Sequence, residues 1–319
     1  MRLCRYDAGL APAWNAFIAQ AENATFLFHR DFMGYHAHRF TDHSLLAYAE
    51  GEVVAVFPAN ESGTETWSHQ GLSYGGLVVA PQLAPPDRLT ILRLILAYYQ
   101  HGGFNKVHYK SLPSFYWAVD QENGEAAMLG QVGAALVRQD VNTVVDLAQP
   151  IHLQQRRRRS VKKAAQAGVS TETSLDFLGF WEHLLAPNLW ARHQVTPVHT
   201  HGEMAELANR FPQRIRLHVA LHQGQTVAGA VVFTTGQAGH AVAHAQYIAA
   251  SPLGKELGAL DWLFAQLLDQ YAPACRWFSF GISTYNSGRQ LNQGLHDWKM
   301  GFGGQIYRHL TYEIACTAH

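Results

Sequence analysis

Residues Leu217–Val231 read LHVALHQGQTVAGAV, two runs of alternating apolar residues joined at Gln223-Gly224. Residues Leu45–Phe57 read LLAYAEGEVVAVF and repeat this pattern, with the join at Glu50-Gly51. Alternation with a period of two predicts strands, and a glycine at the join supplies the backbone freedom that a tight turn needs. Both stretches therefore predict β-hairpins.

The two hairpins begin a repeat that continues downstream. When their turn glycines are aligned, Val54-Ala55 also aligns with Val227-Ala228. Helical spacing follows each hairpin, at Leu89, Leu92, Leu96 and Tyr99 in the first copy and at Leu260, Leu263, Leu267 and Tyr271 in the second. Each helix leads into a short strand, Lys106–Leu112 or Arg276–Ile282. The order hairpin, strand, helix, strand occurs twice and predicts an internal duplication.

Hairpins combined with single helices between strands predict an α/β fold with mixed sheets and some α+β character. A predicted strand at Ala135–Leu147 ends before Gln149-Pro150, because proline cannot continue a strand ladder. We therefore predict an N-terminal domain at residues 1–149 and a C-terminal domain at residues 150–319. A basic helix from Leu153 to Ala167 follows the join and ends at Gly168.

The composition bounds the class of protein. In 319 residues, 48% are hydrophobic and 15% are charged, which predicts a sizeable buried core. The 24 Lys and Arg residues balance 24 Asp and Glu residues, which argues against a protein devoted to duplex nucleic acid. The three cysteines form no CxxC, and no signal peptide or long apolar run is present, so we expect a soluble cytoplasmic protein.

Several classes of active site are disfavoured by missing motifs. There is no GxSxG elbow, P-loop or strand-anchored GxGxxG, which argues against a serine hydrolase, an NTPase and a dinucleotide oxidoreductase. The 19 histidines include close pairs, but no third ligand follows at a recognisable spacing such as HExxH. We therefore expect no metal.

Six motifs give the chain a family resemblance: TFLFHRDFMGYH (Thr25–His36), SHQGLSYGG (Ser68–Gly76), HYKSLPSFY (His108–Tyr116), PVHT (Pro197–Thr200), HAQYIAAS (His244–Ser251) and GISTYNSGRQLNQGLHDWKMGFGG (Gly281–Gly304). They resemble motifs of the tandem-GNAT group of bacterial proteins, which includes the Fem-type aminoacyltransferases and acetyltransferase-like proteins of polysaccharide gene clusters. The resemblance covers nearly the whole chain. It implies two fused, pseudo-duplicated GNAT-like domains and an N-acyltransferase that uses acyl-CoA or aminoacyl-tRNA as the donor.

The resemblance also indicates where CoA would bind. GNAT enzymes hold the CoA pyrophosphate on backbone N–H groups of a glycine-rich loop at the start of a helix. The first copy has Pro85-Pro86-Asp87 at this point, which cannot supply the amides. The second copy has an incomplete glycine loop at Gly254–Ala259. If acetyl-CoA or another acyl-CoA binds, we expect it on the second copy, with contacts from Gln246, Gly254, Lys255, Gly258 and Ala259.

Acylation of an amine needs a base, donors for the oxyanion and an acid for the leaving group. We expect His69 to be the base, and Tyr247 or Ser283 to be the acid or the oxyanion donor. The alternatives are a hydrogen-bonded histidine in a glycine-rich turn and a tyrosine that caps the core. The expected substrate contacts are Ser68, Tyr74, Tyr109, Lys110, His199, Thr284, Asn286, Asn292 and Lys299.

Two further segments could hold an anionic ligand. A helix over Asn286–Trp298 would put Asn292 and Lys299 on one face; the alternative is a turn, a cap and a surface lysine. Arg156–Arg159 and Lys162-Lys163 would form basic stripes on their helix, suited to a nucleotide-sugar diphosphate, CoA phosphates or a tRNA backbone. The alternative is a solvated helix face.

The leading hypothesis is an acyltransferase that acts on an amino group of a sugar nucleotide or a related cell-envelope precursor. The donor would lie against the second copy, and the acceptor would reach in from the first. A second hypothesis is a tRNA-dependent aminoacyltransferase, which requires RNA binding that the zero net charge does not favour. A third is a binding protein that kept the tandem fold and lost catalysis.

Overall fold

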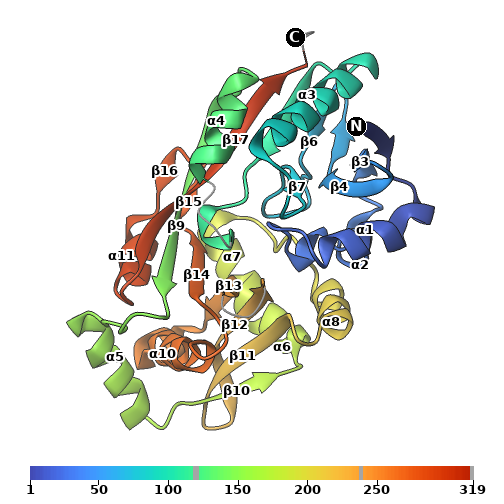
Figure 1. Ribbon diagram of the computed structural model, residues 1–319. Helices are drawn as coiled ribbons and strands as arrows, with labels where there is room; N and C mark the ends of the chain where they lie inside the picture. Colours follow the sequence, from blue (N-terminus) through green and yellow to red (C-terminus); the bar gives the residue numbers. More distant parts are fainter. Residues whose placement is uncertain (118–121, 237–239, 317–319) are drawn as a thin grey trace. The chain divides into compact units, whose positions relative to one another are not determined.

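The computed structural model describes residues 1–117, 122–236 and 240–316 (Figure 1). The chain divides into two compact units, and each contains one of the predicted hairpins. The first unit comprises Met1–Val141, Thr284–Gln290 and Tyr307–His319, and the second comprises Asn142–Ser283 and Leu291–Ile306. The first unit thus includes two short stretches from the C-terminal half of the sequence, Thr284–Gln290 and Tyr307–His319. The cut after residue 149 stays a prediction for where the two copies meet in the sequence.

The first unit contains two groups of strands. One sheet has the order β1-β3-β4-β7, with β1 (Arg2–Arg5), β3 (Leu45–Ala49), β4 (Glu52–Phe57) and β7 (Val78–Val79). A second run has the order β17-β8-β6-β5-β2, with β17 (Gln305–Ala315), β8 (Lys106–Lys110), β6 (Glu65–Trp67), β5 (Asn60–Ser62) and β2 (Thr41–Asp42). Strand β6 pairs with β8 in parallel, and β8 pairs with β17 antiparallel. The short hairpin strands β15 (Thr284–Tyr285) and β16 (Gln290–Leu291) pair with each other.

Helices cover the strands of the first unit on both faces. Its helices and helical turns are η1 (Ala8–Leu10), α1 (Ala11–Ile18), η2 (Phe26–Phe28), α2 (Arg30–Met33), η3 (Gly34–His36), α3 (Pro85–His101), η4 (Ser114–Tyr116) and α4 (Glu122–Gln131). Buried residues of the two helices, among them Ile91 of α3 and Leu129 of α4, pack with Ala55, Val107 and Ile314 in one core. Helix α1 instead contacts β4 from outside this core (Figure 1).

The second unit is built on one mixed sheet. Its strands run in the order β10 (Ser170–Ser174), β11 (Ile215–His222), β12 (Gln225–Thr235), β13 (Val242–Ala250), β14 (Trp277–Ile282) and β9 (Ala135–Asp146). The β13–β14 pairing is parallel and the others are antiparallel. This confirms the predicted mixed sheet.

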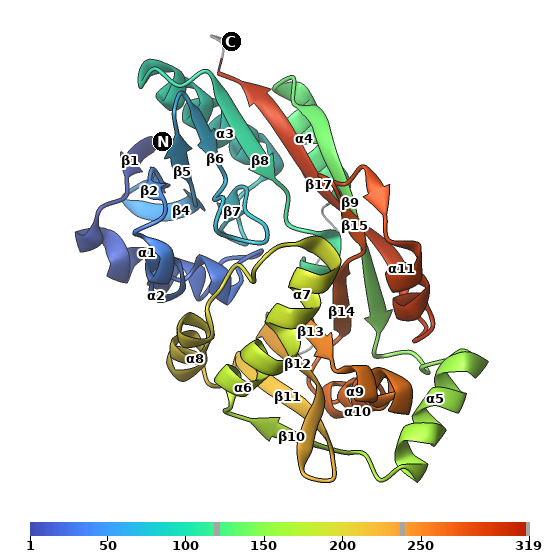
Figure 2. The same ribbon diagram turned by 180° about the vertical axis from the view of Figure 1, so that it is seen from behind.

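Helices sandwich this sheet. They are α5 (Gln155–Gln166), α6 (Phe177–Phe180), the π-helical turn η5 (Trp181–Leu185), α7 (Ala186–His193), α8 (His201–Arg210), α9 (Pro252–Leu257), α10 (Ala259–Tyr271) and α11 (Gln293–Met300). Helix α10 and the strand alanines form an apolar core with Phe278, Phe280 and Phe302. Phe180 of α6 lies against Gly229, on the other face of the sheet from that core. Figure 2 shows α10 together with α9 and α5.

The hairpins of the two copies agree in detail. Residues 50 and 51 have φ of 52° and 89°, and residues 223 and 224 have φ of 52° and 76°. Positive φ at both central residues defines the type I′ turn that suits the twist of a hairpin. Each hairpin then contains a β-bulge at the same place, with Val54 and Val227 as the extra residues. The duplication predicted from the sequence is therefore confirmed.

The bulges also have the same hydrogen bond to the strand that follows. The backbone N–H of Ala80, after β7, donates to the carbonyl of Val54 at 2.9 Å. The backbone N–H of Ser251, after β13, donates to the carbonyl of Val227 at 2.9 Å. Strand β13 is therefore the counterpart of β7, and both precede a helix that returns along the sheet. None of the helices in the described ranges has the length and hydropathy of a membrane span.

Candidate functional site

In the second unit, parallel pairing between β13 and β14 stops part-way along the strands. The last paired residues are His244 and Ser279, whose side chains share a hydrogen bond of 3.0 Å. Beyond them, β13 continues to Ala250 and still pairs with β12, but its other edge has no strand partner among the described residues. Between Ala245 and Ala249, the backbone N–H and C=O groups that point away from β12 thus lie along an unpaired strand edge, whereas the Ala250 carbonyl accepts the Asn188 side-chain amide at 2.9 Å.

In the first copy β7 is also an edge strand, but its outward backbone groups are already bonded. The Asn23 side chain donates to the Leu77 carbonyl and accepts the Val79 N–H, each at 2.9 Å, and the Glu22 N–H donates to the Val79 carbonyl at 2.9 Å.

A tyrosine side chain bonds one further backbone group of this segment. Strands β7 and β8 belong to different sheets. The Tyr109 phenol oxygen, on β8, accepts a hydrogen bond from the backbone N–H of Leu77 at 2.9 Å and donates to the Glu125 carboxylate at 2.7 Å. A Cβ on Gly76 would lie 2.7 Å from the Tyr109 ring, so the packing is tight. The predicted substrate residue Tyr109 is thus a fully buried part of this packing.

Tyr247 and His199 meet at the unpaired edge of β13. The phenol oxygen lies 2.5 Å from Nδ1 of His199 and accepts the His199 backbone N–H at 3.3 Å. The Trp181 indole N–H, in the π-helical turn, donates to the His199 carbonyl at 2.9 Å. The sequence placed Tyr247 and His199 in separate roles, as acid and as substrate contact, whereas the structure brings them together. A phenol held by an imidazole is a chemically competent proton donor.

Gln246 is the extra residue of a second bulge, in β13. Tyr247 is opposite Val231 and Ala245 is opposite Val232, so Gln246 has no cross-strand partner. The Gln246 side-chain oxygen is buried without a hydrogen-bond partner among the described residues. A buried acceptor left unpaired costs free energy, which marks this position as one where a ligand donor would be stabilised.

Two more predicted residues lie at the end of β14. The Lys299 ammonium donates to the carbonyls of Gly281 and Ile282 at 2.9 and 2.6 Å. Lys299 is 2% exposed, and this burial lowers the pKa of its side chain to about 7. The Ser283 hydroxyl is buried without a hydrogen-bond partner in the described structure. The surface-lysine interpretation of Lys299 is wrong, because the side chain reaches inward to the strand end.

The segment predicted as an incomplete glycine loop is helical. Residues Pro252–Leu257 form α9, and Gly258, with φ of 78°, separates α9 from α10. The Gly254 backbone N–H donates to the Ser251 hydroxyl at 3.0 Å, and a Cβ on Gly254 would clash with the Val227 carbonyl. Gly254 is therefore explained by close packing over the bulge, a requirement that the sequence does not reveal.

The remaining predicted cofactor residues have different surroundings. The Lys255 ammonium donates to the Asn188 side-chain oxygen at 2.8 Å. A Cβ on Gly258 would clash with the Ser160 hydroxyl of α5, and Ala259 is fully buried. The start of α10 is thus covered by α5. Contacts of Lys255, Gly258 and Ala259 with a cofactor stay predictions.

The basic helix α5 is confirmed, but its cations are not equivalent. The Arg157 guanidinium is buried and pairs with the Asp261 carboxylate of α10 at 2.5 Å. That carboxylate also accepts the Trp298 indole N–H at 2.6 Å. The other five cations, Arg156, Arg158, Arg159, Lys162 and Lys163, are exposed. Arg157 therefore anchors the helix, and among the exposed cations the Lys163 ammonium donates to the Glu256 carbonyl of α9 at 2.7 Å.

In the first unit, the segment Ser68–Gly76 lies along the end of β8. The Ser68 hydroxyl accepts the Lys110 backbone N–H at 2.7 Å, and Gly75 donates its N–H to the Lys110 carbonyl at 2.9 Å. The Lys110 ammonium donates to the Leu72 carbonyl. Burial and the positive charge of Arg138 lower the pKa of Lys110 to about 7. The predicted residues Ser68 and Lys110 are thus neighbours.

His69 is buried in the same segment with φ of 72°. Its Nδ1 accepts the Gly71 backbone N–H at 3.2 Å, and its ring lies 5.0 Å from that of His36. Burial, with smaller contributions from His36 and Lys110, lowers the pKa of His69 well below its usual value. The imidazole is therefore neutral at pH 7. Tyr74 is also buried, 4.8 Å from the Tyr116 ring, and burial raises its pKa.

The predicted helix over Asn286–Trp298 is wrong at its start. Asn286 lies in the exposed turn between β15 and β16 with φ of 49°, and α11 begins only at Gln293. Asn292 is the N-cap of α11, and its side chain accepts the Leu295 N–H at 3.1 Å. Thr284 donates its hydroxyl to the buried Asp140 carboxylate at 2.6 Å. Asn286 is thus a turn residue and Asn292 is a helix cap, as the alternative interpretation of these residues expected.

Asn142 is a polar residue that the sequence analysis missed. It lies opposite Ile282, one residue from Ser283, and is 4% exposed. Its side-chain oxygen is buried and has no partner among the described residues. Asn142 lies within a largely apolar strand, so the sequence alone does not mark it as a site residue. Its pairing opposite Ile282 places it beside Ser283. In the described ranges, no group of three or more His, Cys, Asp or Glu side chains could hold a metal ion.

A comparison with protein-family models decides the class of the second unit. Residues 153–300 match the acetyltransferase (GNAT) domain. This segment is a GNAT domain. The GNAT match includes β13, α10 and β14 and thus contains the unpaired edge of Ala245–Ala250. The expected resemblance and the expected enzyme class, an N-acyltransferase, are confirmed over these residues.

Solved structures extend the likeness to both units. FemX has 11% identity and a TM-score of 0.68, with 98% of this chain and 97% of FemX covered. The C-terminal domain of a putative lysylphosphatidylglycerol synthetase from Agrobacterium fabrum has 13% identity and a TM-score of 0.62, with 98% and 92% covered. A tandem GNAT protein from the clavulanic acid biosynthesis pathway has 13% identity and a TM-score of 0.51, with 100% and 99% covered. At these identities the likeness shows the fold, a Fem-like tandem of GNAT units. A search of curated proteins finds no significant match.

Proposed function

We propose that the protein transfers an acyl group from acyl-CoA to a primary amine, and that the second unit binds the donor along Ala245–Ala250. The observation that carries this proposal is the end of β13–β14 pairing at His244 and Ser279. The pantetheine arm of CoA contains amide groups, which can pair with an unpaired strand edge as an added strand does. The first copy is not proposed to bind a donor, since Asn23, Glu22 and Tyr109 already bond the corresponding backbone groups of Leu77 and Val79.

The polar groups at this edge suit acyl transfer. The amine nitrogen would attack the thioester carbonyl, the C–S bond would break, and the thiolate would take a proton. Tyr247, held at 2.5 Å from His199, is the proposed acid for this thiolate. The buried Ser283 hydroxyl is the proposed donor to the oxyanion. The Gln246 side chain would orient the donor through its buried oxygen.

His69 stays the proposed base for the acceptor amine. Its lowered pKa keeps the imidazole neutral at pH 7, and Nδ1, which accepts the Gly71 N–H at 3.2 Å, is the nitrogen that would release this contact and take the proton. The same shift makes it a weak base, so it would assist an amine that is already largely neutral. An amino group of a sugar nucleotide or a related cell-envelope precursor remains the proposed acceptor.

Aminoacyl-tRNA is a second candidate donor because of helix α5. Five exposed cations within Arg156–Lys163 have no acidic residue among them on that helix. Such a face could bind an RNA backbone, and its affinity would fall steeply with salt. FemX and the putative lysylphosphatidylglycerol synthetase domain share the tandem fold, which is compatible with either donor.

Thermal unfolding with each donor separates these candidates. Acetyl-CoA at about 100 times its dissociation constant should stabilise the protein by about 2.7 kcal/mol. Tyr247→Phe should lower the melting temperature of the free protein, because it also removes the hydrogen bonds to His199, but should keep the shift caused by acetyl-CoA and reduce turnover. His69→Ala should likewise keep donor binding and reduce turnover. Stabilisation by aminoacyl-tRNA alone would favour the second donor, and no stabilisation by either would contradict acyl transfer.

A further inference from the structure

Trp181 contacts both members of the Tyr247–His199 pair in the second unit. Its indole N–H donates to the His199 carbonyl at 2.9 Å. Its ring lies 5.1 Å from the Tyr247 ring at an interplanar angle of 68°, which is an edge-to-face contact. Trp181 is 4% exposed, and the proposed steps of acyl transfer make no use of it. A buried side chain that touches both groups can fix the geometry between them.

The backbone of His199 is held at both of its polar groups. Its N–H donates to the Tyr247 phenol oxygen at 3.3 Å, and its carbonyl accepts the Trp181 indole N–H. The next residue, Thr200, is the N-cap of α8 and forms a capping box with Glu203. These bonds direct the imidazole toward the phenol, with Nδ1 at 2.5 Å from the oxygen. The indole bond comes from a separate segment, η5, so a change at residue 181 can remove it without altering the pair or the cap.

A proline gives a physical reason for the π-helical turn that carries Trp181. Residues Phe177–His193 form one continuous run of helix, in which η5 separates α6 from α7. Pro187 lies inside this run, and a proline ring clashes with the carbonyl four residues earlier, here that of His183 in η5. The turn is wider, with the Ala186 N–H bonded to the Trp181 carbonyl five residues back. Such turns are rare within α-helices and occur frequently at functional sites.

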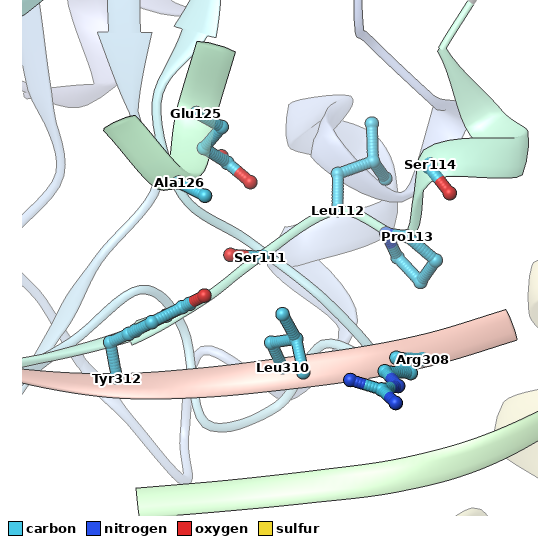
Figure 3. A pocket seen from close by; sticks show the side chains of 9 residues that line it. All are labelled: Ser111, Leu112, Pro113, Ser114, Glu125, Ala126, Arg308, Leu310 and Tyr312. Carbon is cyan, nitrogen blue, oxygen red and sulfur yellow. The ribbon is translucent and has the colours of Figure 1, made fainter. Parts of the chain in front are cut away.

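The first copy contains an indole bond of the same kind, without an acid–base pair to hold. The Trp117 indole N–H donates to the Leu112 carbonyl at 3.3 Å. Figure 3 shows Leu112 within Ser111–Ser114, the segment that follows β8. Trp117 is 5% exposed, close to the 4% of Trp181. Trp117 is therefore a matched control for the loss of an indole bond to a backbone carbonyl.

We propose that Trp181 is a positioning residue for the acid of the transfer reaction. Through the His199 carbonyl it keeps the imidazole against the Tyr247 phenol, and its ring supports the phenol at the edge of β13. Loss of the indole N–H would release the His199 carbonyl and lengthen the bond within the pair. A misplacement of about 1 Å can slow a reaction about a hundred-fold, so a small change at this pair is enough. The catalytic part of this role rests on the proposed function, whereas the geometry of the pair does not.

Proton NMR of the free protein tests the geometry without any substrate. A bond of 2.5 Å is at the short end of the hydrogen-bond range, so its proton should resonate downfield of the amide protons. Tyr247→Phe should remove this resonance and thereby assigns it. Trp181→Phe should shift it or abolish it. Incorporation of benzothienylalanine at position 181 should do the same, because sulfur replaces the indole N–H while the ring keeps its size and the fold is preserved.

Trp117→Phe should leave the downfield resonance in place. The proposal would be overturned if the wild-type protein lacked this resonance, or if both changes at position 181 left it where it was.

Kinetics separates this proposal from the proposed function. The readout is CoA release from acetyl-CoA, with glucosamine as the probe amine. Both changes at position 181 should reduce kcat at least ten-fold and keep the dissociation constant of acetyl-CoA within two-fold, and Trp117→Phe should change neither. Wild-type kcat in both would overturn the role of Trp181. No turnover by the wild-type protein would contradict transfer to a sugar amine, and the resonance would still decide whether Trp181 holds the pair.

Discussion

The Tyr109 phenol oxygen accepts the backbone N–H of Leu77 at 2.9 Å, which fixes the side chain between the diverging strands of the first copy. The second copy has no such side chain at this position. Its β14 has Ser279 there, bound to His244 at 3.0 Å, and the strand edge beyond remains unpaired. The two copies therefore share a hairpin, a bulge and a helix, but differ at the point where a donor would bind.

Tyr109→Phe tests the structural role of this contact. The substitution removes the acceptor for the buried Leu77 N–H and the donor to Glu125, while the ring still fills its place. We expect the free energy of unfolding to fall by about 1–3 kcal/mol. Urea unfolding measures this change, and acetyl-CoA affinity should stay the same. A loss of donor affinity with unchanged stability would show that the first copy binds the donor.

Gln246→Leu tests whether the orphan oxygen of the β13 bulge serves a ligand. Because this oxygen has no described partner in the free protein, its removal should leave the free energy of unfolding unchanged or raise it by about 1 kcal/mol. Acetyl-CoA should then bind at least ten-fold more weakly by calorimetry. Ser279→Ala is the matched control, since its hydroxyl is bonded to His244, and it should destabilise the fold. Full donor affinity in Gln246→Leu would remove this residue from the donor site.

The elements of the fold could be predicted because each has a local signal. Glu50-Gly51 and Gln223-Gly224 determine their turns, and the leucine spacing determines α3 and α10. The bulges at Val54 and Val227 could not be predicted, since an extra residue in a strand leaves the apolar run unchanged. The sequence also did not predict that each compact unit includes segments from both halves of the chain. This arrangement depends on pairing between strands that are far apart in the sequence.

The candidate site was predictable in its residue types but less so in its contacts. The Tyr247–His199 pair joins residues 48 apart in the sequence, and no periodicity relates them. Gly254 looked like part of a phosphate loop, whereas its lack of a side chain is required by the Val227 carbonyl. Glycine marks close approach of the backbone, but the sequence does not say whether the neighbour is a ligand or another strand.

The buried Lys299 predicts a pH dependence of stability. Burial lowers its pKa from 10.5 to about 7, so between these values the unfolded chain binds a proton that the folded chain does not. The free energy of unfolding should therefore rise with pH across this window, by about 1.4 kcal/mol per pH unit for each such lysine. Lys110, whose pKa is also lowered to about 7, contributes with the same sign.

Urea unfolding at pH 7.4, 7.8 and 8.2 measures this slope, below the range in which tyrosines and the cysteines of the unfolded chain titrate. At higher pH the buried Cys275 and Cys316 thiols, whose pKa is raised to about 11, lower the stability as pH rises. Lys299→Met should reduce the slope by about half, since Lys110 remains. Lys162→Met, at an exposed position of α5, is the control and should leave the slope unchanged. An unaltered slope in Lys299→Met would mean that the buried ammonium keeps its proton at neutral pH through its two carbonyl contacts.

Among the basic residues of α5, Arg157 should contribute to the stability of the fold, whereas the exposed ones should contribute little. Arg157→Met leaves the buried Asp261 carboxylate without its guanidinium, which should lower the free energy of unfolding by about 3–5 kcal/mol. Arg158→Met, one residue away and exposed, should change it by about 0.5 kcal/mol or less. Thermal or urea unfolding of both variants checks this. Equal effects would show that the Arg157–Asp261 pair does not anchor the helix.

Hydrogen–deuterium exchange with and without acetyl-CoA tests the central claim most directly. If the donor pairs with the unpaired edge of β13, amides within Ala245–Ala250 should exchange more slowly when acetyl-CoA is present. The corresponding segment of the first copy, Gly76–Val79, should exchange at the same rate in both conditions. Protection of Gly76–Val79 in place of Ala245–Ala250, or no protection of either at saturating acetyl-CoA, would contradict donor binding by the second unit.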